Sequence, residues 1–233
     1  MSGLSRALLF GVFSNSTILR LTGAGRAVTA AIATDKTLPS QMLEVLDKLC
    51  LQCKNRNIAM IVDAESQDYQ VSIDKVTLEL MRKFNQDGTV VVYNTYQAYL
   101  KKTPRNVMDH LVEASKGGFT LGLRVVRGAY ILTKERLLIH DTKEDTDNLY
   151  NSIAQGALKR QLGATGGSGP DSVIFPSVKL LLCGHNKESL SDALRLHHDR
   201  IKNDLPTTPV AFAQLHGMTG HDKYSIITSA LSI

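Results

Sequence analysis

The sequence predicts an α/β fold of the (β/α)8 barrel type, and three features lead to this prediction. Short apolar runs rich in β-branched residues alternate with longer segments of helical periodicity. Successive runs begin about 30 residues apart, the length of one strand and helix unit, except for one wider gap after Val126. Polar residues follow the ends of the runs, where a barrel carries its functional groups.

The apolar runs are short enough to be buried strands. Residues 18–22 form a first run near the amino end, and later runs occupy residues 58–62, 89–93, 121–126, 178–183 and 210–215. Helical periodicity is found at residues 42–53, 73–84, 107–114, 146–162 and 189–201. The sequence therefore predicts about six of the eight strands of a complete barrel.

Polar residues at the ends of these runs favour a functional site at the carboxyl ends of the strands. The loops at that face of a barrel carry the active site. A doubly wound sheet binds its ligand at the same ends, so this feature does not separate the two folds. The residues are Asp63 and Glu65, Asn94 and Gln97, Arg124 and Arg127, His185 and Asn186, and Gln214 and His216.

The composition indicates a single domain spanning residues 1–233. Hydrophobic residues make up 43% of the chain and charged residues 21%, which is enough for a sizeable core. The net charge of +5 comes from basic residues scattered among acidic ones, which argues against a nucleic-acid partner. No apolar run reaches the roughly 18 residues that cross a bilayer. The glycine-rich residues 163–170 lack the Lys-Ser/Thr of a P-loop and predict a surface loop.

Cys50 and Cys53 have the spacing of a redox or metal-binding pair. They lie within the helical periodicity of residues 42–53, and no second Cys or His pair follows at zinc-finger spacing. We therefore expect two buried helix cysteines and no metal site.

The first 34 residues have the composition of a mitochondrial transit peptide. Arg6, Arg20 and Arg26 occur among Ser and Thr, and no acidic residue precedes Asp35. The alternative is that part of this stretch is the first strand of the fold, which cleavage after residue 30 would remove.

Six short motifs occur in order along the chain. The first three are Ile61-Val62-Asp63-Ala64-Glu65, Asn94-Thr95-Tyr96-Gln97-Ala98-Tyr99-Leu100 and Arg124-Val125-Val126-Arg127-Gly128-Ala129-Tyr130. The others are Thr146-Asp147 with Tyr150, Gly184-His185-Asn186 and Phe212-Ala213-Gln214-Leu215-His216-Gly217-Met218. Together with residues 19–24, this series resembles the strand-end motifs of proline dehydrogenases, especially the fungal mitochondrial members. Each motif is weak alone, but the ordered set makes coincidence a poor explanation.

The resemblance implies an incomplete (β/α)8 barrel of the proline dehydrogenase type, with FAD at its carboxyl face and proline stacked against the flavin. Arg124 matches an arginine beside the flavin, where a cation stabilises the negative charge acquired on reduction. Gly128 has no Cβ, so its backbone can approach a ligand closely. The matched cofactor-binding residues are Gln97, Arg124, Arg127, Gly128, Ala129, Thr146, His185, Asn186 and Gln214.

The resemblance also implies a set of substrate-binding and catalytic residues. Tyr130 and Leu215 match residues around the proline ring, and Asp63 matches an aspartate behind it. Arg20 stands where the family usually has a lysine that binds the substrate carboxylate and pairs with this aspartate. Arginine keeps the charge but changes the geometry of the contact. The expected catalytic residues are Arg124, Asp63 and Arg20.

The family carries two further motifs after the position of Met218, a Tyr-x-Pro-x-Gly strand and a final helix with an Arg-Arg pair. Neither occurs before Ile233. Because the arginine pair normally binds the proline carboxylate, we expect this chain alone to bind proline poorly and its barrel to remain open. An inactive FAD-binding or scaffold remnant of the same fold is the alternative to an active enzyme.

The activity that the resemblance implies is oxidation of L-proline to pyrroline-5-carboxylate, with FAD as cofactor and a membrane quinone as electron acceptor. It also implies a mitochondrial location, on the matrix side or in peripheral contact with the inner membrane. Without the resemblance, the residues suggest a generic barrel enzyme acting on a phosphorylated metabolite. No late-strand phosphate loop supports that alternative.

Overall fold

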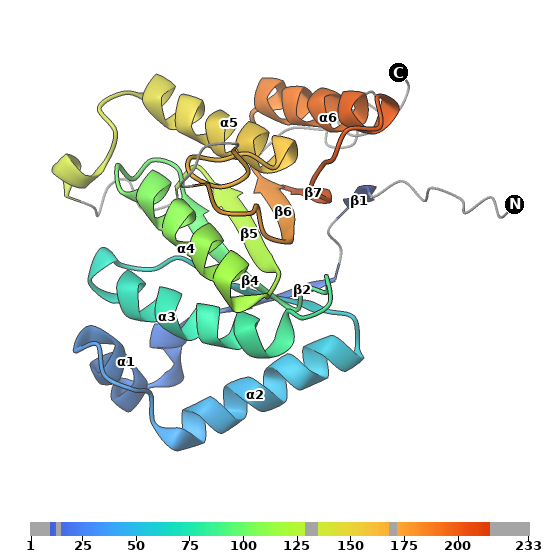
Figure 1. Ribbon diagram of the computed structural model, residues 1–233. Coiled ribbons are helices and arrows are strands. Elements are labelled where there is room, and N and C mark those ends of the chain that lie inside the picture. Colours follow the sequence, from blue (N-terminus) through green and yellow to red (C-terminus); the bar gives the residue numbers. More distant parts are fainter. Residues whose placement is uncertain (1–9, 13–14, 129–134, 168–171, 215–233) are drawn as a thin grey trace, which may run out of the picture.

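Seven parallel strands form one sheet in the order β1-β7-β6-β5-β4-β3-β2 (Figure 1). The computed structural model describes residues 10–12, 15–128, 135–167 and 172–214. The strands are β1 Phe10–Val12, β2 Ser16–Leu19, β3 Ala59–Val62, β4 Val92–Gln97, β5 Leu121–Val126, β6 Val178–Cys183 and β7 Val210–Ala213.

Helices follow the strands and cover the outer face of the sheet (Figure 1). Each of β3 to β6 is followed by one long helix, which is the repeated strand and helix unit of a barrel. The helices are α1 Arg26–Ala33, α2 Ser40–Asn55, α3 Gln67–Phe84, α4 Thr103–Gly117, α5 Lys143–Lys159 and α6 Lys187–Lys202, with short 3-10 helices η1 Leu21–Ala24 and η2 Arg136–Leu138.

The pairing of β1 and β2 requires the sheet to be rolled. Val12 pairs with Phe212 of β7, and Ser16, four residues later, pairs with Ala59 of β3. Four residues span at most about 14 Å, whereas six inter-strand spacings of a flat sheet would separate β1 from β2 by about 29 Å. The sheet must therefore curve into part of a barrel, which confirms the predicted fold class. In the described residues β1 and β2 pair with β7 and β3 but not with each other.

Most of the predicted elements occur, and the bounds of β4 differ from the prediction because polar residues form its second half. β5 and β6 have the predicted bounds, whereas β4 runs from residue 92 to 97 instead of 89 to 93. Asn94 is buried within β4. Its side-chain amide donates a hydrogen bond to Asp74 Oδ1 at 2.8 Å, which satisfies the buried polar group. Near the amino end the strand stops at Leu19, and η1 replaces the rest of the predicted run 18–22.

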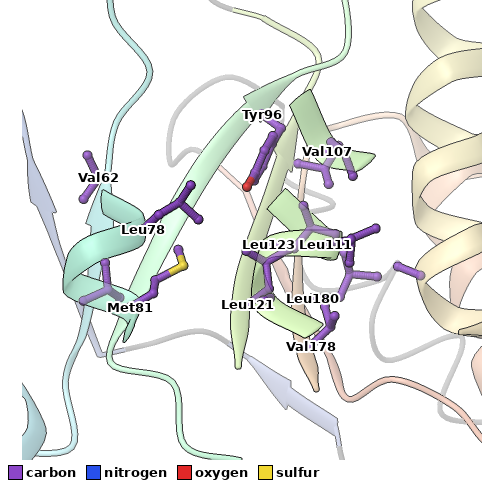
Figure 2. Close-up of a cluster of buried hydrophobic side chains, with 14 of the residues drawn as sticks. Val62, Leu78, Met81, Tyr96, Val107, Leu111, Leu121, Leu123, Val178 and Leu180 are labelled. Atoms are coloured by element: carbon purple, nitrogen blue, oxygen red, sulfur yellow. The ribbon is translucent and has the colours of Figure 1, made fainter. Parts of the chain in front are cut away.

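The main core lies between the outer face of the sheet and the helices (Figure 2). Leu123 of β5 and Leu180 of β6 are 0% and 1% exposed, and they face Leu111 of α4, which is fully buried. Burying one such leucine stabilises the fold by about 1.5 to 3 kcal/mol. Replacing Leu111 by alanine is expected to cost about 2 to 5 kcal/mol, since the change would also leave a cavity.

A smaller apolar layer lies on the inner face of the sheet. Ile61 of β3, Tyr93 of β4 and Leu181 of β6 form a separate buried cluster. Side chains alternate between the two faces of a strand, so the residues two positions further on also point inward. Those residues are Asp63, Thr95 and Cys183, and they carry polar groups toward the carboxyl ends of the strands.

The cysteines of α2 agree with the expected structure. Cys50 and Cys53 are buried in the helix, and burial raises the pKa of the Cys50 thiol to about 12. No group of metal-ligating side chains occurs in the part of the chain that the structure describes. None of the helices formed by these residues has the length and apolar character of a membrane span.

Candidate active site

A cavity of about 700 Å³ opens at the carboxyl ends of the strands. Its walls include apolar side chains from strands far apart in the sheet order, among them Ile18 of β2 and Ala213 of β7. Such a volume is typical of a site for a small molecule or a cofactor. Eight of the predicted site residues line it: Asp63, Gln97, Arg124, Arg127, Gly128, His185, Asn186 and Gln214.

Arg124 is held in the cavity wall by three other segments of the sheet. Its Nη1 donates to Thr95 Oγ1 at 2.8 Å and to Asp63 Oδ1 at 3.2 Å. Its Nε lies 3.4 Å from Cys183 Sγ. The arginine side chain is only 14% exposed, so these contacts form in a partly dehydrated setting that strengthens them. The guanidinium group therefore has a fixed orientation at the wall of the cavity.

Asp63 accepts hydrogen bonds from two arginines. Its Oδ2 lies 3.2 Å from Nε and 3.1 Å from Nη2 of Arg20, and its Oδ1 bonds Arg124. The single carboxylate thus contacts two positive charges. Arg20 is 59% exposed and is not among the residues that line the cavity, so it reaches Asp63 from the rim.

Thr95 connects Arg124 to the backbone of the sheet. Its hydroxyl donates to the carbonyl of Val62 at 2.8 Å and accepts from Arg124. Thr95 and Arg124 are partners in the register of β4 and β5, so they lie side by side on the inner face. A hydroxyl at this position can therefore orient the guanidinium group without an ionic contact.

Arg127 lies at another part of the cavity wall and is held by the helices α5 and α6. Its Nε donates to Asp147 Oδ1 at 2.5 Å, and its Nη2 donates to Ser189 Oγ at 2.8 Å. Its guanidinium carbon lies 4.3 Å from the centre of the Tyr150 ring, a cation–π contact. These contacts leave the remaining nitrogen, Nη1, without a hydrogen-bond partner among the described residues.

The second turn of α5 supplies the acidic partner, Asp147. Burial opposes ionisation of Asp147, but hydrogen bonds from Lys143 and Arg127 outweigh this effect and lower the pKa of the carboxyl group. Lys143 also lines the cavity, which adds a positive charge at its edge. Thr146 does not line it; its hydroxyl makes a long hydrogen bond, 3.4 Å, to the carbonyl of Thr142.

Several buried polar atoms beside the cavity have no partner among the described residues. They are both ring nitrogens of His185, Nη1 of Arg127 and the hydroxyl of Tyr150. A Cβ added to Gly184 would lie 3.1 Å from Arg127 Nη1, so the absence of a side chain there leaves space beside this buried nitrogen. An unpaired buried polar group costs about 1 to 3 kcal/mol. The cluster therefore fits a ligand rich in acceptor oxygens, as the expected FAD is.

Two predicted contacts have roles within the protein itself. Gly128 has a φ of +146°, and a Cβ there would lie 2.0 Å from Cδ1 of Tyr99, so packing against this ring requires the glycine. Asn186 caps α6, since its Oδ1 accepts from the amide of Ser189 at 3.1 Å. Both residues still line the cavity. Three other predicted residues, Ala129, Tyr130 and Leu215, lie outside the described residues.

Besides Arg20 and Thr146, two more predicted residues do not line the cavity, and three polar residues of the site were not predicted. Thr95, Cys183 and Lys143 line the cavity. The alternation of inward and outward side chains along β4 and β6 could have identified Thr95 and Cys183. Asn94 faces the helices and bonds Asp74, and Glu65 bonds Thr22, so neither lines the cavity.

The sequence profile of the family described as "Proline dehydrogenase" matches residues 13–231. The probable mitochondrial proline dehydrogenase of Schizosaccharomyces pombe is 34% identical over 191 residues, which cover 80% of this chain and 38% of that protein. Proline dehydrogenase 1 of Dictyostelium discoideum is 32% identical, with 78% of this chain and 32% of that protein covered. The human proline dehydrogenase 1 is 30% identical, with 67% and 25% covered. The chain thus spans about a quarter to two fifths of the length of these relatives.

Solved structures agree at the level of the fold. Proline utilization A from Bdellovibrio bacteriovorus, inactivated by N-propargylglycine, matches with a TM-score of 0.66 at 19% identity. The match covers 91% of this chain and 21% of that one, so the similarity concerns the barrel described above. Because the family profile covers most of the sequence, the chain belongs to the proline dehydrogenase family.

Proposed function

We propose that this protein oxidises L-proline to pyrroline-5-carboxylate with FAD as its cofactor and passes the electrons to a membrane quinone. The observation that carries the proposal is the pair Arg124–Asp63, which lines a cavity at the carboxyl face beside unpaired polar groups. Membership of the family and the names of the relatives support the substrate. The relatives named as mitochondrial support a mitochondrial location, with peripheral contact to the inner membrane where a quinone would be met.

Two parts of the cavity wall would hold the cofactor. Gln97 and Arg124 would contact the flavin ring, and Arg127 and His185 would donate to the phosphate oxygens, as their unpaired nitrogens allow. FAD bound there supplies an acceptor for the hydride removed from proline. Gly128, Ala129, Asn186 and Gln214 complete the proposed set of cofactor contacts, which leaves out Thr146 because it does not line the cavity.

The protein contributes electrostatics and orientation to the proposed reaction. The cation of Arg124 stabilises negative charge that develops in the cavity, and Asp63 and Thr95 hold it in place so that it need not reorganise. Apolar residues such as Ile61 and Val126 exclude water from the same wall, which strengthens the charged contacts.

Arg20 would bind the substrate carboxylate. Its guanidinium group is oriented by Asp63 and remains 59% exposed, so an anion that enters from the rim can reach it. Tyr130 and Leu215 would enclose the proline ring. Because arginine presents a planar fork instead of a single ammonium group, the carboxylate contact would be bidentate.

The experiment measures dye reduction by the FAD-loaded protein with L-proline and with an acyclic amino acid such as L-valine. A strong preference for L-proline is expected, since Arg20 and the apolar walls select a compact ring with one carboxylate. Thr95→Val serves as a site variant and Ser72→Ala, whose hydroxyl bonds Ile32 O far from the cavity, as a control. Equal rates with both amino acids, or dye reduction that does not require FAD, would refute the proposal.

A further inference from the structure

We propose that Thr22 and Glu65 act as a positioning pair that holds Arg20 against Asp63, and thereby sets the affinity for the substrate carboxylate. The inference deepens the proposed function and rests on it for the identity of the substrate. Its starting point is the register between β2 and β3, which continues beyond the ends of both strands.

The strands β2 and β3 pair with a constant offset of 43 residues, from Ser16 with Ala59 to Leu19 with Val62. The final backbone contact is the amide of Asp63, which donates to Leu19 O at 3.0 Å. Two side-chain contacts then follow with the same offset of 43 residues, first Arg20 with Asp63 and next Thr22 with Glu65. The pairing of the two segments is thus extended by side chains after the sheet ends.

The two side-chain contacts differ in burial. Arg20 is 59% exposed, and an exposed ion pair contributes only about 0 to 1 kcal/mol, because its ordering cost offsets most of the attraction. Glu65 is 9% exposed, so its carboxylate requires hydrogen bonds to offset the loss of water. The amide of Thr22 donates to Glu65 Oε1 at 3.2 Å, and the Thr22 hydroxyl donates to Oε2. The buried contact is therefore the one that can fix the backbone of residues 20–22.

Glu65 is itself anchored on the other side. Its amide donates to Gln70 Oε1 at 3.0 Å, and Gln70 Nε2 donates to Asp74 Oδ1 at 2.9 Å. Asn94 of β4 donates to the same oxygen at 2.8 Å. The loop after β3 is thereby joined to α3 and β4. Thr22 then transmits this fixed position to the segment that carries Arg20.

The consequence is specific to substrate binding. Arg124 is held by Asp63, Thr95 and Cys183. Within the described part of the chain no hydrogen bond joins these three residues to Thr22, so Arg124 should keep its orientation without the pair. Loss of the Thr22–Glu65 contact should therefore weaken proline binding and leave the maximum rate of flavin reduction nearly unchanged.

The variant Thr22→Val keeps the size of the side chain and removes its hydroxyl, and Thr22→Ser restores it. Anaerobic stopped-flow reduction over a range of L-proline concentrations separates the apparent Kd from the limiting rate. We expect Thr22→Val to raise the Kd about fivefold with less than a twofold change in limiting rate, as the loss of one hydrogen bond implies. Thr22→Ser should return the Kd to that of the wild type.

A control and a double variant separate positioning from a general loss of stability. Ser72→Ala removes hydrogen bonds to Ile32 and Asp35 at the opposite end of α1, and it should leave the Kd unchanged. In an Arg20→Met background, Thr22→Val should have no further effect on the Kd. A fivefold effect that persists in that background would overturn the inference, as would an unchanged Kd in the single variant.

A second readout does not depend on proline. The Nε–H of Arg20 should give a slowly exchanging ¹⁵N NMR signal in the wild type, because it donates to Asp63, and the signal should exchange faster in Thr22→Val. Arg20→Lys assigns the signal. If proline fails to reduce the flavin of the wild type, the proposed function fails, and this measurement still decides the positioning claim. Equal exchange in both proteins would contradict it.

Discussion

Asp63 Oδ1 accepts a hydrogen bond from Arg124 Nη1 at 3.2 Å, and this contact connects the end of β3 with β5 across the intervening strand β4. The carboxylate is 19% exposed and the guanidinium group 14%, so the pair is shielded from water on most sides. Such a pair orients both groups, and the orientation of Arg124 is the central element of the proposed mechanism.

We expect Asp63→Asn to slow proline-dependent flavin reduction by about 10- to 100-fold. The change removes the negative charge that both arginines share, and a hydrogen bond to a charged group contributes about 1.5 to 3 kcal/mol. Stopped-flow reduction at saturating proline measures the effect. Asp68→Asn, an exposed carboxylate that bonds Ser66, provides a matched control with an expected rate equal to the wild type. A fast Asp63→Asn variant would remove this residue from the mechanism.

The variant Arg124→Met should impair flavin reduction more than proline binding, because the cation matters most as negative charge builds on the ring. A loss of about 100-fold in the limiting rate is expected, with a change in apparent Kd of less than about fivefold. Both values come from the same concentration series. An unchanged limiting rate would show that Arg124 has a structural role only.

Replacing Gly128 by alanine should destabilise the protein by about 1 to 3 kcal/mol or more. The new Cβ would lie 2.0 Å from the ring of Tyr99, and the φ of +146° is unfavourable for a residue with a side chain. Urea unfolding of the variant measures the loss. Gly23→Ala is the control, since a Cβ there would meet nothing within 4 Å. Equal stability of the two variants would contradict the packing described for Tyr99.

The stability of the fold should decrease below about pH 6.5 in part through His110. Burial lowers the pKa of this histidine despite the nearby carboxylates Asp74, Glu113 and Asp109, which raise it. Below the pKa of an unfolded histidine, about 6.5, the unfolded state binds a proton that the folded state resists, so the free energy of unfolding falls as the pH decreases.

The variant His110→Gln tests this pH dependence. It should reduce the slope of stability against pH by up to about 1.4 kcal/mol per pH unit between about pH 6.5 and 5.5. Urea unfolding at several pH values gives both slopes. His197, whose pKa burial also lowers, remains in both proteins and therefore cancels from the comparison. Identical slopes would show that His110 does not contribute.

The sequence predicted the parts of the fold that depend on local pattern. β5 and β6 have the predicted bounds because their runs are apolar on both faces apart from a few positions. The prediction of a strand over residues 18–22 was wrong beyond Leu19. Leu21 is fully buried in η1, and apolar residues alone do not distinguish a strand from a 3-10 turn. Helix α1 was not predicted at all.

The motifs contain many of the residues that line the cavity, but they do not predict the contacts that depend on packing. Arg124 and Asp63 both line the cavity and form an ion pair, a contact that the sequence did not predict. The partners of Arg127 come from two helices, Asp147 of α5 and Ser189 of α6, and their meeting depends on how those helices pack, which no local pattern encodes. The actual partner of Gly128, the Tyr99 ring, was unforeseen for the same reason.

An anaerobic titration of the FAD-loaded protein with L-proline, followed by absorbance near 450 nm, tests the proposed roles of Asp63 and Arg124 most directly. We expect L-proline to bleach the flavin absorbance, and we expect Asp63→Asn and Arg124→Met, loaded to the same flavin content, to be bleached far more slowly. A protein that does not retain flavin, or whose flavin absorbance is unchanged by L-proline, would contradict this expectation.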